Sequence, residues 1–311
     1  MDIRNLRLEE KARLVCGHSS MSTYPIEREG IAAITLSDGP NGLRKEQPNG
    51  DSLGGISESL PATCFPAGVT LASTFNRDLA YQEGEAIAKE CQYYHVNVIL
   101  GPAMNIKRNP LCGRNFEYYS EDPLVSAKIA IGFVTGAQNQ HVACCPKHFS
   151  CNNEENHRFT GNSVVEERSL REIYLRPFEA VVRNTHPWAM MNSYNQINGT
   201  HASENKYIMK DILRDEWGFD GVLMTDWGGI VNRVEGLKAT TDLEMPGMVE
   251  TNISAIVEAV KNKKLDEAIL DTSVTRILKL QERTKAENTE VNFHQHYALA
   301  ERIAEEGPAP V

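Results

Sequence analysis

The stretch Gly221-Val222-Leu223-Met224-Thr225-Asp226-Trp227-Gly228-Gly229 decides how we interpret the fold of this sequence. Its apolar run is too short for a helix and is typical of a buried strand. A helical pattern ends at a glycine shortly before it, so Asp226 stands where a strand stops and a loop begins. In parallel α/β folds this position carries chemistry. Taken alone, an aspartate that caps the next turn is the better interpretation, and the rest of the chain decides.

Short apolar runs alternate with helical patterns along the whole chain. The predicted strands are residues 31–36, 96–100, 142–145, 188–191, 222–224 and 241–245. The predicted helices are residues 6–17, 77–94, 124–138, 166–184, 206–217, 231–238, 253–260, 266–282 and 297–306. This alternation is typical of βαβ units and a parallel sheet.

The kind of parallel sheet follows from what the first strand lacks. No Gly-x-Gly-x-x-Gly motif follows it, and the chain has no phosphate-loop pattern, which argues against a nucleotide-binding doubly wound sheet. We therefore predict an α/β fold of the (β/α)8 TIM-barrel type. Because only about six strands can be named, we expect the barrel to be irregular or incomplete. Residues 45–63 are polar and rich in Gly and Pro, which predicts a surface loop.

Composition narrows the class of protein. The 311 residues suffice for one barrel of ~250 residues, and 41% hydrophobic and 24% charged residues are an ordinary globular balance. A net charge of -10 argues against nucleic acid or an anionic membrane as partner. No apolar run approaches the ~20 residues of a membrane span.

The seven cysteines indicate the compartment. Their number is odd, and Cys144 and Cys145 are adjacent in an apolar run, which suits free thiols better than a disulfide framework. The first residues show no secretory pattern. No cysteine pair has zinc-ligand spacing, so we expect a cytoplasmic protein that needs no metal and no cofactor.

Polar side chains follow the predicted strands, at the ends that a barrel brings to one face. They are Asp38, Arg114, Lys147, His148, Tyr194 and Asp226. Each has a structural alternative: Arg114 could pair with Glu117, and Lys147 with His148 could be a solvated strand end. Together, carboxylates, cations and aromatic rings without a metal cage, a serine elbow or a phosphate cradle suit a neutral polyhydroxylated ligand, which is a sugar.

Six motifs extend these positions: residues 37–44 (SDGPNGLR), 109–123 (NPLCGRNFEYYSEDP), 147–149 (KHF), 152–158 (NNEENHR), 191–195 (MNSYN) and 224–227 (MTDW). In this order they resemble the β-glucosidases of glycoside hydrolase family 3, and the similarity runs from residue 8 to residue 300. In the family's N-acetylglucosaminidase branch a Gly-rich loop with a His-Asp pair follows the Lys-His-Phe element. Residues 150–154 read SCNNE here, which is similar to the β-glucosidase branch.

The resemblance implies a retaining β-glycosidase that binds a terminal β-D-glucosyl residue and works by double displacement. It implies that Asp226 is the nucleophile and that Trp227 is a stacking wall. The sugar-hydroxyl ligands that it implies are Asp38, Arg114, Lys147, His148 and Arg158, with Met191 and Tyr194 lining the same subsite. We expect Arg114, Lys147 and Arg158 to favour the ionised form of Asp226.

The sequence departs from the family at its end. β-Glucosidases of this branch carry their acid/base glutamate on a second domain, whereas this chain stops at Val311. We interpret residues 1–311 as a single barrel domain, in which residues 292–311 are a helix and tail leading towards an absent second domain. We expect weak or no hydrolysis of alkyl glucosides and cellobiose, and we expect a homodimer or a complementing second domain as partner. Glu117, Glu154 and Glu155 are acid candidates to which the resemblance gives no role.

Two other functions compete with this interpretation. A non-catalytic sugar-binding barrel is favoured by the missing acid, but it would not need the Asp226-Trp227 pair. An aldolase with Lys147 as Schiff base is disfavoured, because charged neighbours are expected around that lysine.

Overall fold

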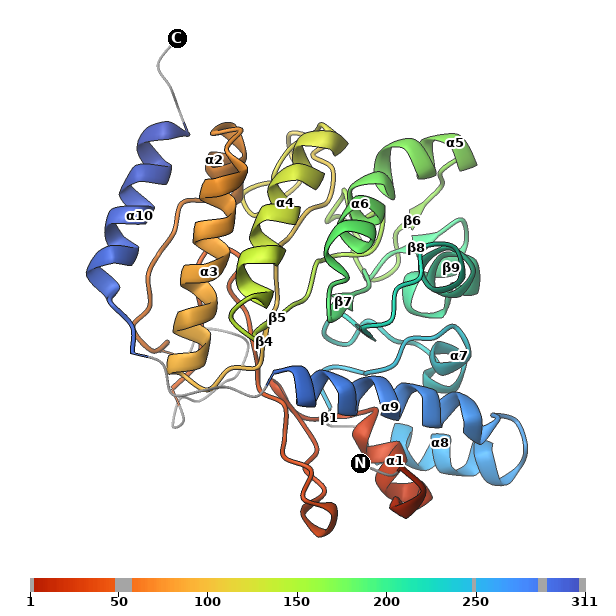
Figure 1. The fold of residues 1–311 in the computed structure, drawn as a ribbon. Helices are drawn as coiled ribbons and strands as arrows, with labels where there is room; N and C mark the ends of the chain where they lie inside the picture. The colour runs from red at the N-terminus through yellow and green to blue at the C-terminus, as the bar shows by residue number, and fades with distance from the viewer. Residues whose placement is uncertain (1–2, 48–57, 248–249, 285–289, 308–311) are drawn as a thin grey trace.

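The computed structural model describes residues 3–47, 58–247, 250–284 and 290–307, and Figure 1 shows their arrangement. Short strands lie inside a surround of longer helices. The predicted surface loop at residues 45–63 and the predicted tail at 307–311 lie partly outside the described residues. Among the described helices, none combines the length and the apolar character that crossing a membrane requires.

The central strands run parallel in two small sheets. β3 (Leu36–Ser37), β4 (Val98–Ile99) and β5 (Ala143–Cys144) form one, in which β4 lies between the other two. β7 (Ala189–Met191) and β10 (Val222–Met224) form the other, with Val222 opposite Ala189. β10 has its predicted bounds, and the other four strands are shorter than predicted, because only two or three residues of each hold a regular ladder.

Further pairings join the two sheets into a circuit. Parallel bridges link Phe149 to Asn192, Met224 to Leu243, and Cys16 to Glu244. The antiparallel hairpin of β1 (Gly17–Ser19) and β2 (Ser22–Thr23) continues from Cys16, and Ser22 bridges back to Thr35, next to β3. The fold is therefore of the (β/α)8 type and irregular, with β2 running against its neighbours. The predicted strand at residues 241–245 contributes single bridges rather than a ladder.

A third sheet lies outside this circuit and was not predicted. It contains β6 (Asn162–Ser163), β8 (Gln196–Ile197) and β9 (Thr200–His201), in the order β6-β8-β9. The pairing of β8 with β9 is antiparallel and closes over Asn198 and Gly199, both at positive φ. A two-residue connection of this kind, Asn-Gly, is the usual signal for a tight hairpin.

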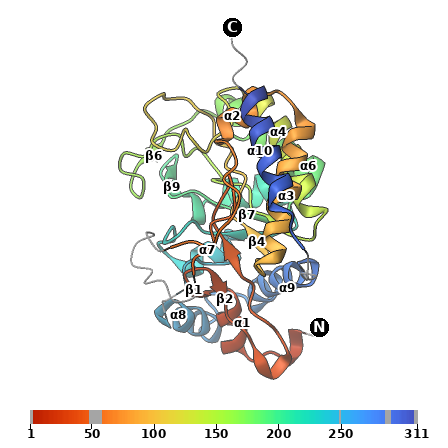
Figure 2. The same cartoon turned by 90° about the vertical axis from the view of Figure 1, so that its left-hand side faces the viewer.

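The α-helices are α1 (Leu8–Leu14), α2 (Gly68–Ser73), α3 (Arg77–Tyr93), α4 (Pro123–Gln138), α5 (Glu167–Ser169), α6 (Arg176–Thr185), α7 (Arg233–Lys238), α8 (Glu250–Lys261), α9 (Glu267–Arg283) and α10 (Phe293–Glu306). The 3-10 segments are η1 (Ile3–Asn5), η2 (Glu27–Glu29) and η4 (Ala202–Glu204), and the π-helical segments are η3 (Leu170–Tyr174) and η5 (Tyr207–Glu216). Figure 2 shows α10 beside α2 and α3, which it contacts.

Capping residues explain where several helices begin. The Asn232 side chain accepts the N–H groups of Val234 and Glu235, so α7 begins two residues later than predicted. Asn292 accepts from Gln295, so α10 begins earlier than predicted. The single helix predicted over residues 166–184 is instead α5, η3 and α6 in succession, because Pro177 has no N–H to continue the regular ladder.

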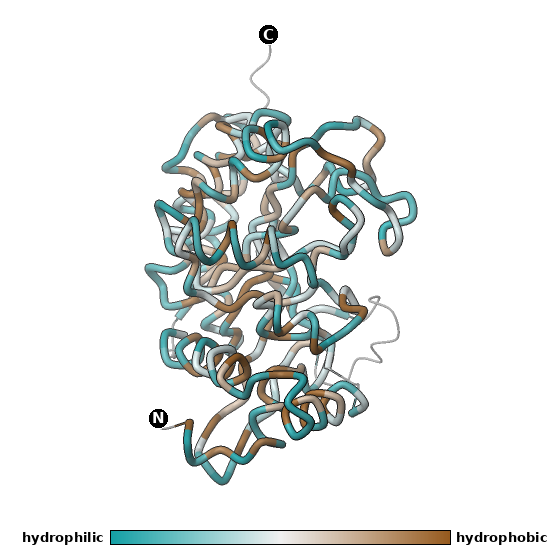
Figure 3. The backbone as a smooth tube through the Cα atoms, turned by 90° about the vertical axis from the view of Figure 1, so that its right-hand side faces the viewer, coloured by the Kyte–Doolittle hydropathy of each residue, from teal (hydrophilic) through white to brown (hydrophobic). Residues whose placement is uncertain are grey.

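Alternate residues of the parallel strands face opposite sides. In β7 and β10, Met190 and Leu223 pack into the hydrophobic cluster that contains α3, α4 and α6 residues. Met191 and Met224 belong to a second cluster, formed with residues of α1, α8 and α9. This is the two-residue period of a strand that is buried on both faces. Figure 3 shows the matching pattern, with hydrophobic segments running through the middle of the molecule.

Candidate active site

A cavity of about 200 Å³ lies at the carboxyl ends of the parallel strands. It is lined by Met21, Asp38, Leu100, Arg114, Lys147, Met191, Asp226 and Trp227. Since one water needs ~10–15 Å³ on this scale, a cavity of about 200 Å³ is many times larger than one water, which suits a small ligand. Six predicted site residues meet here: Asp38, Arg114, Lys147, Met191, Asp226 and Trp227.

The strand period explains why these side chains converge. Leu36, Cys145 and Met224 all belong to the second hydrophobic cluster, which lies on the inner side of the strands. Two residues further along the chain from each of them stand Asp38, Lys147 and Asp226. The same period places Leu100 after Val98 and Met191 after Ala189 on the inner side. The site residues thus continue the inward-facing row of each strand beyond its last apolar residue.

Asp226 is 7% exposed and reaches its neighbours through two different oxygens. Its Oδ1 accepts the Trp227 N–H at 2.8 Å. Its Oδ2 has no hydrogen-bond partner among the described residues, although Arg114 Nη1 lies 3.8 Å away and His148 Nε2 3.6 Å away. A buried carboxylate oxygen without a partner is costly, so this oxygen is free for a ligand or a reacting atom.

Burial is the largest influence on the pKa of Asp226 and raises it. Arg114 and Lys147 lower it, with the sign expected from the sequence, and the Trp227 N–H and the nearby Tyr194 hydroxyl lower it further, but the net pKa stays above the ordinary value of aspartate. Arg158, the third expected cation, does not line the cavity. A carboxylate with a raised pKa is more basic when ionised, which suits a nucleophile.

Lys147 and Asp38 form the second polar pair of the cavity. Lys147 Nζ donates to Asp38 Oδ1 at 2.9 Å, and the lysine side chain is almost completely buried. Burial would raise the pKa of Asp38, but the Lys147 ammonium lowers it below its usual value. Asp38 is therefore held as a carboxylate that can accept hydrogen bonds but is poorly suited to donate a proton.

Arg114 pairs with Glu117, as the structural alternative from the sequence predicted, and still lines the cavity. The Arg114 Nε donates to Glu117 Oε1, so one side of the guanidinium is used for this ion pair. The other side faces Asp226 Oδ2. The structural and functional interpretations of Arg114 are thus compatible, because a guanidinium has five donors.

The remaining predicted residues surround the cavity. His148 is buried and contacts Asp226. The Tyr194 hydroxyl donates to the Trp227 carbonyl oxygen at 3.1 Å. Arg158 lies over the Tyr194 ring, 4.5 Å from its centroid, and forms an ion pair with Glu155. Arg158 is therefore placed to support Tyr194 rather than to line the cavity.

Trp227 forms one wall of the cavity and is anchored by the β1-β2 hairpin. Its Nε1–H donates to the Ser20 carbonyl oxygen at 2.8 Å, and Met21, the next residue in the hairpin turn, lines the cavity too. Sequence reasoning missed Met21, because the hairpin that carries it was not predicted. It also missed Leu100, which the alternation of residues 96–100 would have placed on the inner side.

Two acid candidates lie outside the cavity. Glu154 uses one oxygen to accept the N–H groups of Glu155 and Asn156 and the other to accept from Asn109. Glu155 accepts from Asn152 at 3.1 Å. Both carboxylates are occupied with local contacts. Among the described residues, no group of three or more His, Cys, Asp or Glu side chains is arranged to hold a metal.

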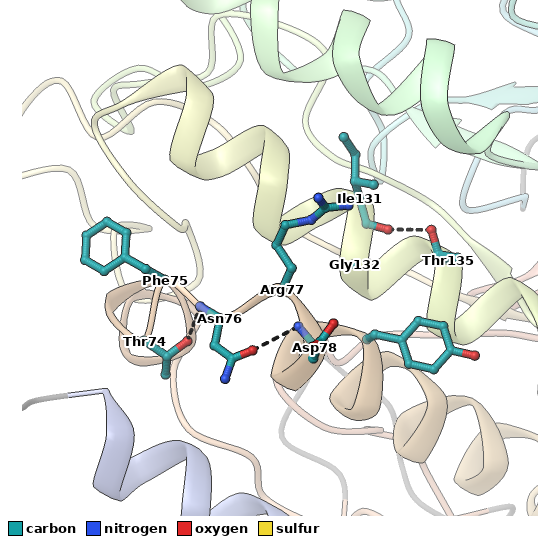
Figure 4. Close-up of a pocket in the computed structure, with 9 residues that line it drawn as sticks. Thr74, Phe75, Asn76, Arg77, Asp78, Ile131, Gly132 and Thr135 are labelled. Atoms are coloured by element: carbon teal, nitrogen blue, oxygen red, sulfur yellow. Dashed lines mark hydrogen bonds between the residues drawn. The ribbon is translucent and has the colours of Figure 1, made fainter.

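A larger pocket of about 690 Å³ lies at the start of α3, against α4 (Figure 4). None of the predicted residues lines it. The Asn76 side chain accepts from Asp78 N–H, and the Thr74 hydroxyl accepts from Asn76 N–H, so both polar groups serve the beginning of the helix. Chemistry is therefore better supported at the smaller cavity around Asp226.

A (β/α)8-type fold that gathers carboxylates, cations and an indole at its strand ends defines a glycoside hydrolase barrel. The chain belongs to glycosyl hydrolase family 3, since residues 49–280 match the family's N-terminal domain. The resemblance found from the sequence motifs is thereby confirmed.

Its relatives are longer proteins. The chain is 45% identical over 307 residues to thermostable beta-glucosidase B of Acetivibrio thermocellus, covering 98% of this chain and 40% of that protein. It is 41% identical to an exo-alpha-(1->6)-L-arabinopyranosidase of Bifidobacterium longum, covering 97% of this chain and 40% of that protein. The structure of beta-glucosidase 3B from Thermotoga neapolitana with alpha-D-glucose superposes with a TM-score of 0.90 at 42% identity, covering 98% of this chain and 46% of that one. The chain thus spans 40% of the length of these curated relatives.

Proposed function

We propose that this chain is the sugar-binding and nucleophile-bearing barrel of a retaining β-glucosidase. The observation that carries the proposal is the open oxygen of Asp226, which is buried, has no hydrogen-bond partner within the described part of the chain, and faces Arg114 and His148. In the first step Asp226 Oδ2 bonds to the anomeric carbon as the bond from that carbon to the leaving-group oxygen breaks, and the leaving group departs as an anion that takes its proton from solvent. Water then bonds to the anomeric carbon and gives one proton to solvent as the bond to Asp226 breaks, which releases the sugar and the ionised Asp226.

The other cavity residues bind the sugar in this proposal. Lys147, Arg114 and Asp38 present donors and an acceptor to hydroxyl groups, and Trp227 offers its apolar face. A sugar that lacks one of these hydroxyls would leave a buried polar group unpaired, which makes such a site selective. The names of the relatives support a terminal β-glucosyl residue, and the arabinopyranosidase makes a pentopyranoside the competing substrate.

The experiment uses a 2-deoxy-2-fluoro-β-D-glucoside with a dinitrophenolate leaving group, which departs without a proton. Intact-mass spectrometry should show one glucosyl adduct on the wild-type chain and none on Asp226→Asn. Asp220→Asn is the matched control, because this exposed aspartate lies outside the cavity and pairs with Arg283 at 3.4 Å. A folded wild-type chain that forms no adduct would contradict the proposal, and the same reagent built on arabinopyranose tests the competing sugar.

A non-catalytic sugar-binding barrel is the second candidate. It is favoured by the cavity lining, in which the carboxylate other than Asp226 is Asp38, held by Lys147 with a lowered pKa. Binding of glucose by calorimetry without any adduct would favour it.

Cytoplasmic localisation also remains a proposal, which is supported by seven free cysteines, six of them buried.

A further inference from the structure

The backbone of His148 is held by the side chain of Asn105. Asn105 Nδ2 donates to the His148 carbonyl oxygen at 2.8 Å, and Asn105 Oδ1 accepts the His148 N–H at 2.6 Å. Burial and the nearby cations Arg114 and Lys147 lower the pKa of His148 well below its usual value. The imidazole is therefore neutral, and only one ring nitrogen carries a proton.

The Nε2 side of the ring faces the candidate nucleophile. Nε2 lies 3.6 Å from Asp226 Oδ2, and both atoms are buried without a hydrogen-bond partner among the described residues. A protonated Nε2 presents a positive edge to the carboxylate, whereas a bare Nε2 would present a lone pair to a negative oxygen. The charge of Asp226 therefore favours the Nε2–H tautomer.

The Nδ1 side of the ring faces Tyr118, which is fully buried. The Tyr118 hydroxyl lies 3.3 Å from Nδ1 and accepts from Asn152 Nδ2 at 3.2 Å. Burial raises the pKa of Tyr118 well above its usual value, so the hydroxyl keeps its proton. With its oxygen already accepting from Asn152, this hydroxyl has its own proton to donate.

We propose that Tyr118 is a positioning residue, whose hydroxyl donates to His148 Nδ1 and holds the Nε2–H towards Asp226 and the sugar. This inference rests on the proposed function of Asp226. The alternative acceptor for Tyr118 is the Asn152 carbonyl oxygen at 3.4 Å. If Tyr118 donated to Asn152 instead and Nδ1 carried the ring proton, the lone pair of Nε2 would face the Asp226 carboxylate. This arrangement is unfavourable because both groups are negative at the contact. The nitrogen that is protonated is set by the hydrogen bond that the other nitrogen makes.

The first test reads the tautomer directly. Long-range proton–nitrogen NMR on the chain labelled with ¹⁵N-histidine distinguishes a protonated ring nitrogen from a bare one, and His148→Gln identifies the signal. We expect a protonated Nε2 and a bare Nδ1. In Tyr118→Phe the Nδ1 resonance should move downfield as its donor is lost. A protonated Nδ1 in the wild type, or an unchanged Nδ1 in Tyr118→Phe, would overturn the inference.

The second test measures how much the positioning contributes. The neighbouring Tyr119 gives a matched control: it is also buried, but its hydroxyl has no hydrogen-bond partner among the described residues. Tyr118→Phe should slow labelling by the fluoroglucoside about ten-fold, the usual effect of one lost buried hydrogen bond, and Tyr119→Phe should leave it unchanged. Equal rates in the two variants would contradict the role. If the wild type forms no adduct, the proposed function fails, and the NMR result still decides the tautomer.

Discussion

Two buried aspartates stand sixteen residues apart in the chain and have opposite surroundings. Asp242 Oδ2 accepts from Arg214 at 2.6 Å and from the Leu223 N–H at 2.9 Å. Its Oδ1 accepts from Ser273 at 2.8 Å and from Arg276 at 2.9 Å. Asp226, by contrast, has one oxygen occupied by the Trp227 N–H and one that no described residue hydrogen-bonds. A saturated carboxylate stabilises the fold, and an open one is available for chemistry.

The two aspartates are also mechanically connected. Asp242 holds Leu223 in the middle of β10, the strand that leads to Asp226, and ties it to Ser273 and Arg276 on α9. The structural aspartate therefore fixes the strand that presents the chemical one. Substitutions at the two positions should separate stability from labelling.

The largest effect is expected for Asp226→Asn. Removing the nucleophile should reduce the rate of labelling by on the order of 10⁶-fold, as for the nucleophile of another covalent mechanism. The fold should survive, because Asn keeps the size of the side chain. Labelling kinetics by mass spectrometry, with circular dichroism as a check on folding, measure both. If Asp226→Asn were still labelled at the wild-type rate, Asp226 would not be the nucleophile, and its contrast with Asp242 would have no functional meaning.

Asp242→Asn should give the converse result. Breaking a buried ion pair by removing one partner costs ~3–5 kcal/mol, because Arg214 and Arg276 lose their counter-charge. We expect the free energy of unfolding, measured in urea, to fall by that amount. Ser273→Ala removes a single hydrogen bond of the same cluster and should cost about 1 kcal/mol. If Asp242→Asn is as stable as the wild type, Asp242 does not stabilise the fold as we propose.

The dependence on the leaving group should come next in size. General acid catalysis contributes ~10²–10⁴-fold, most for poor leaving groups, and Asp38 is held ionised by Lys147. The 311-residue chain should therefore release dinitrophenolate from a glucoside far faster than methanol. Steady-state assays with a series of aryl and alkyl glucosides measure this. Equal rates across the series would show a proton donor in this chain.

The pH dependence should be the smallest effect. Burial raises the pKa of Asp226, so labelling should decline with falling pH at a higher value than an ordinary aspartate, ~3.9, would give. Because the folded pKa is the higher one, stability from this group is present below the unfolded pKa and is lost as the pH rises through the folded pKa. Asp226→Asn should therefore be more stable than the wild type at neutral pH. Arg114→Gln should raise the labelling pKa further, and an unchanged pKa would contradict the role of Arg114.

Much of the site could be predicted because it follows strand periodicity. Asp38, Lys147 and Asp226 each stand two residues beyond an inward-facing apolar residue. In a (β/α)8 fold the carboxyl ends of the strands meet on one face, so these three side chains were expected to lie together. The family resemblance added Arg158, which the structure places behind Tyr194, outside the cavity lining. The assignment of roles remains a prediction until labelling is measured.

What the sequence did not reveal depends on contacts between distant segments. The β1-β2 hairpin brings Met21 to the cavity through pairing with residues beside β3, which no local pattern indicates. The sequence likewise does not predict which carboxylate oxygens of Asp226 and Asp242 accept hydrogen bonds. Asp226 follows a short apolar segment and Asp242 precedes Leu243, but neither pattern shows the partners that η5, β10 and α9 supply to Asp242.

The most direct measurement is a crystal structure of the chain after reaction with the fluoroglucoside. The account predicts a bond from the anomeric carbon to Oδ2 of Asp226, the oxygen that lacks a partner among the residues the structure describes, while Oδ1 keeps the Trp227 N–H. Attachment to Asp38 or Glu117, or a cavity that holds intact glycoside with no bond to Asp226, would contradict it.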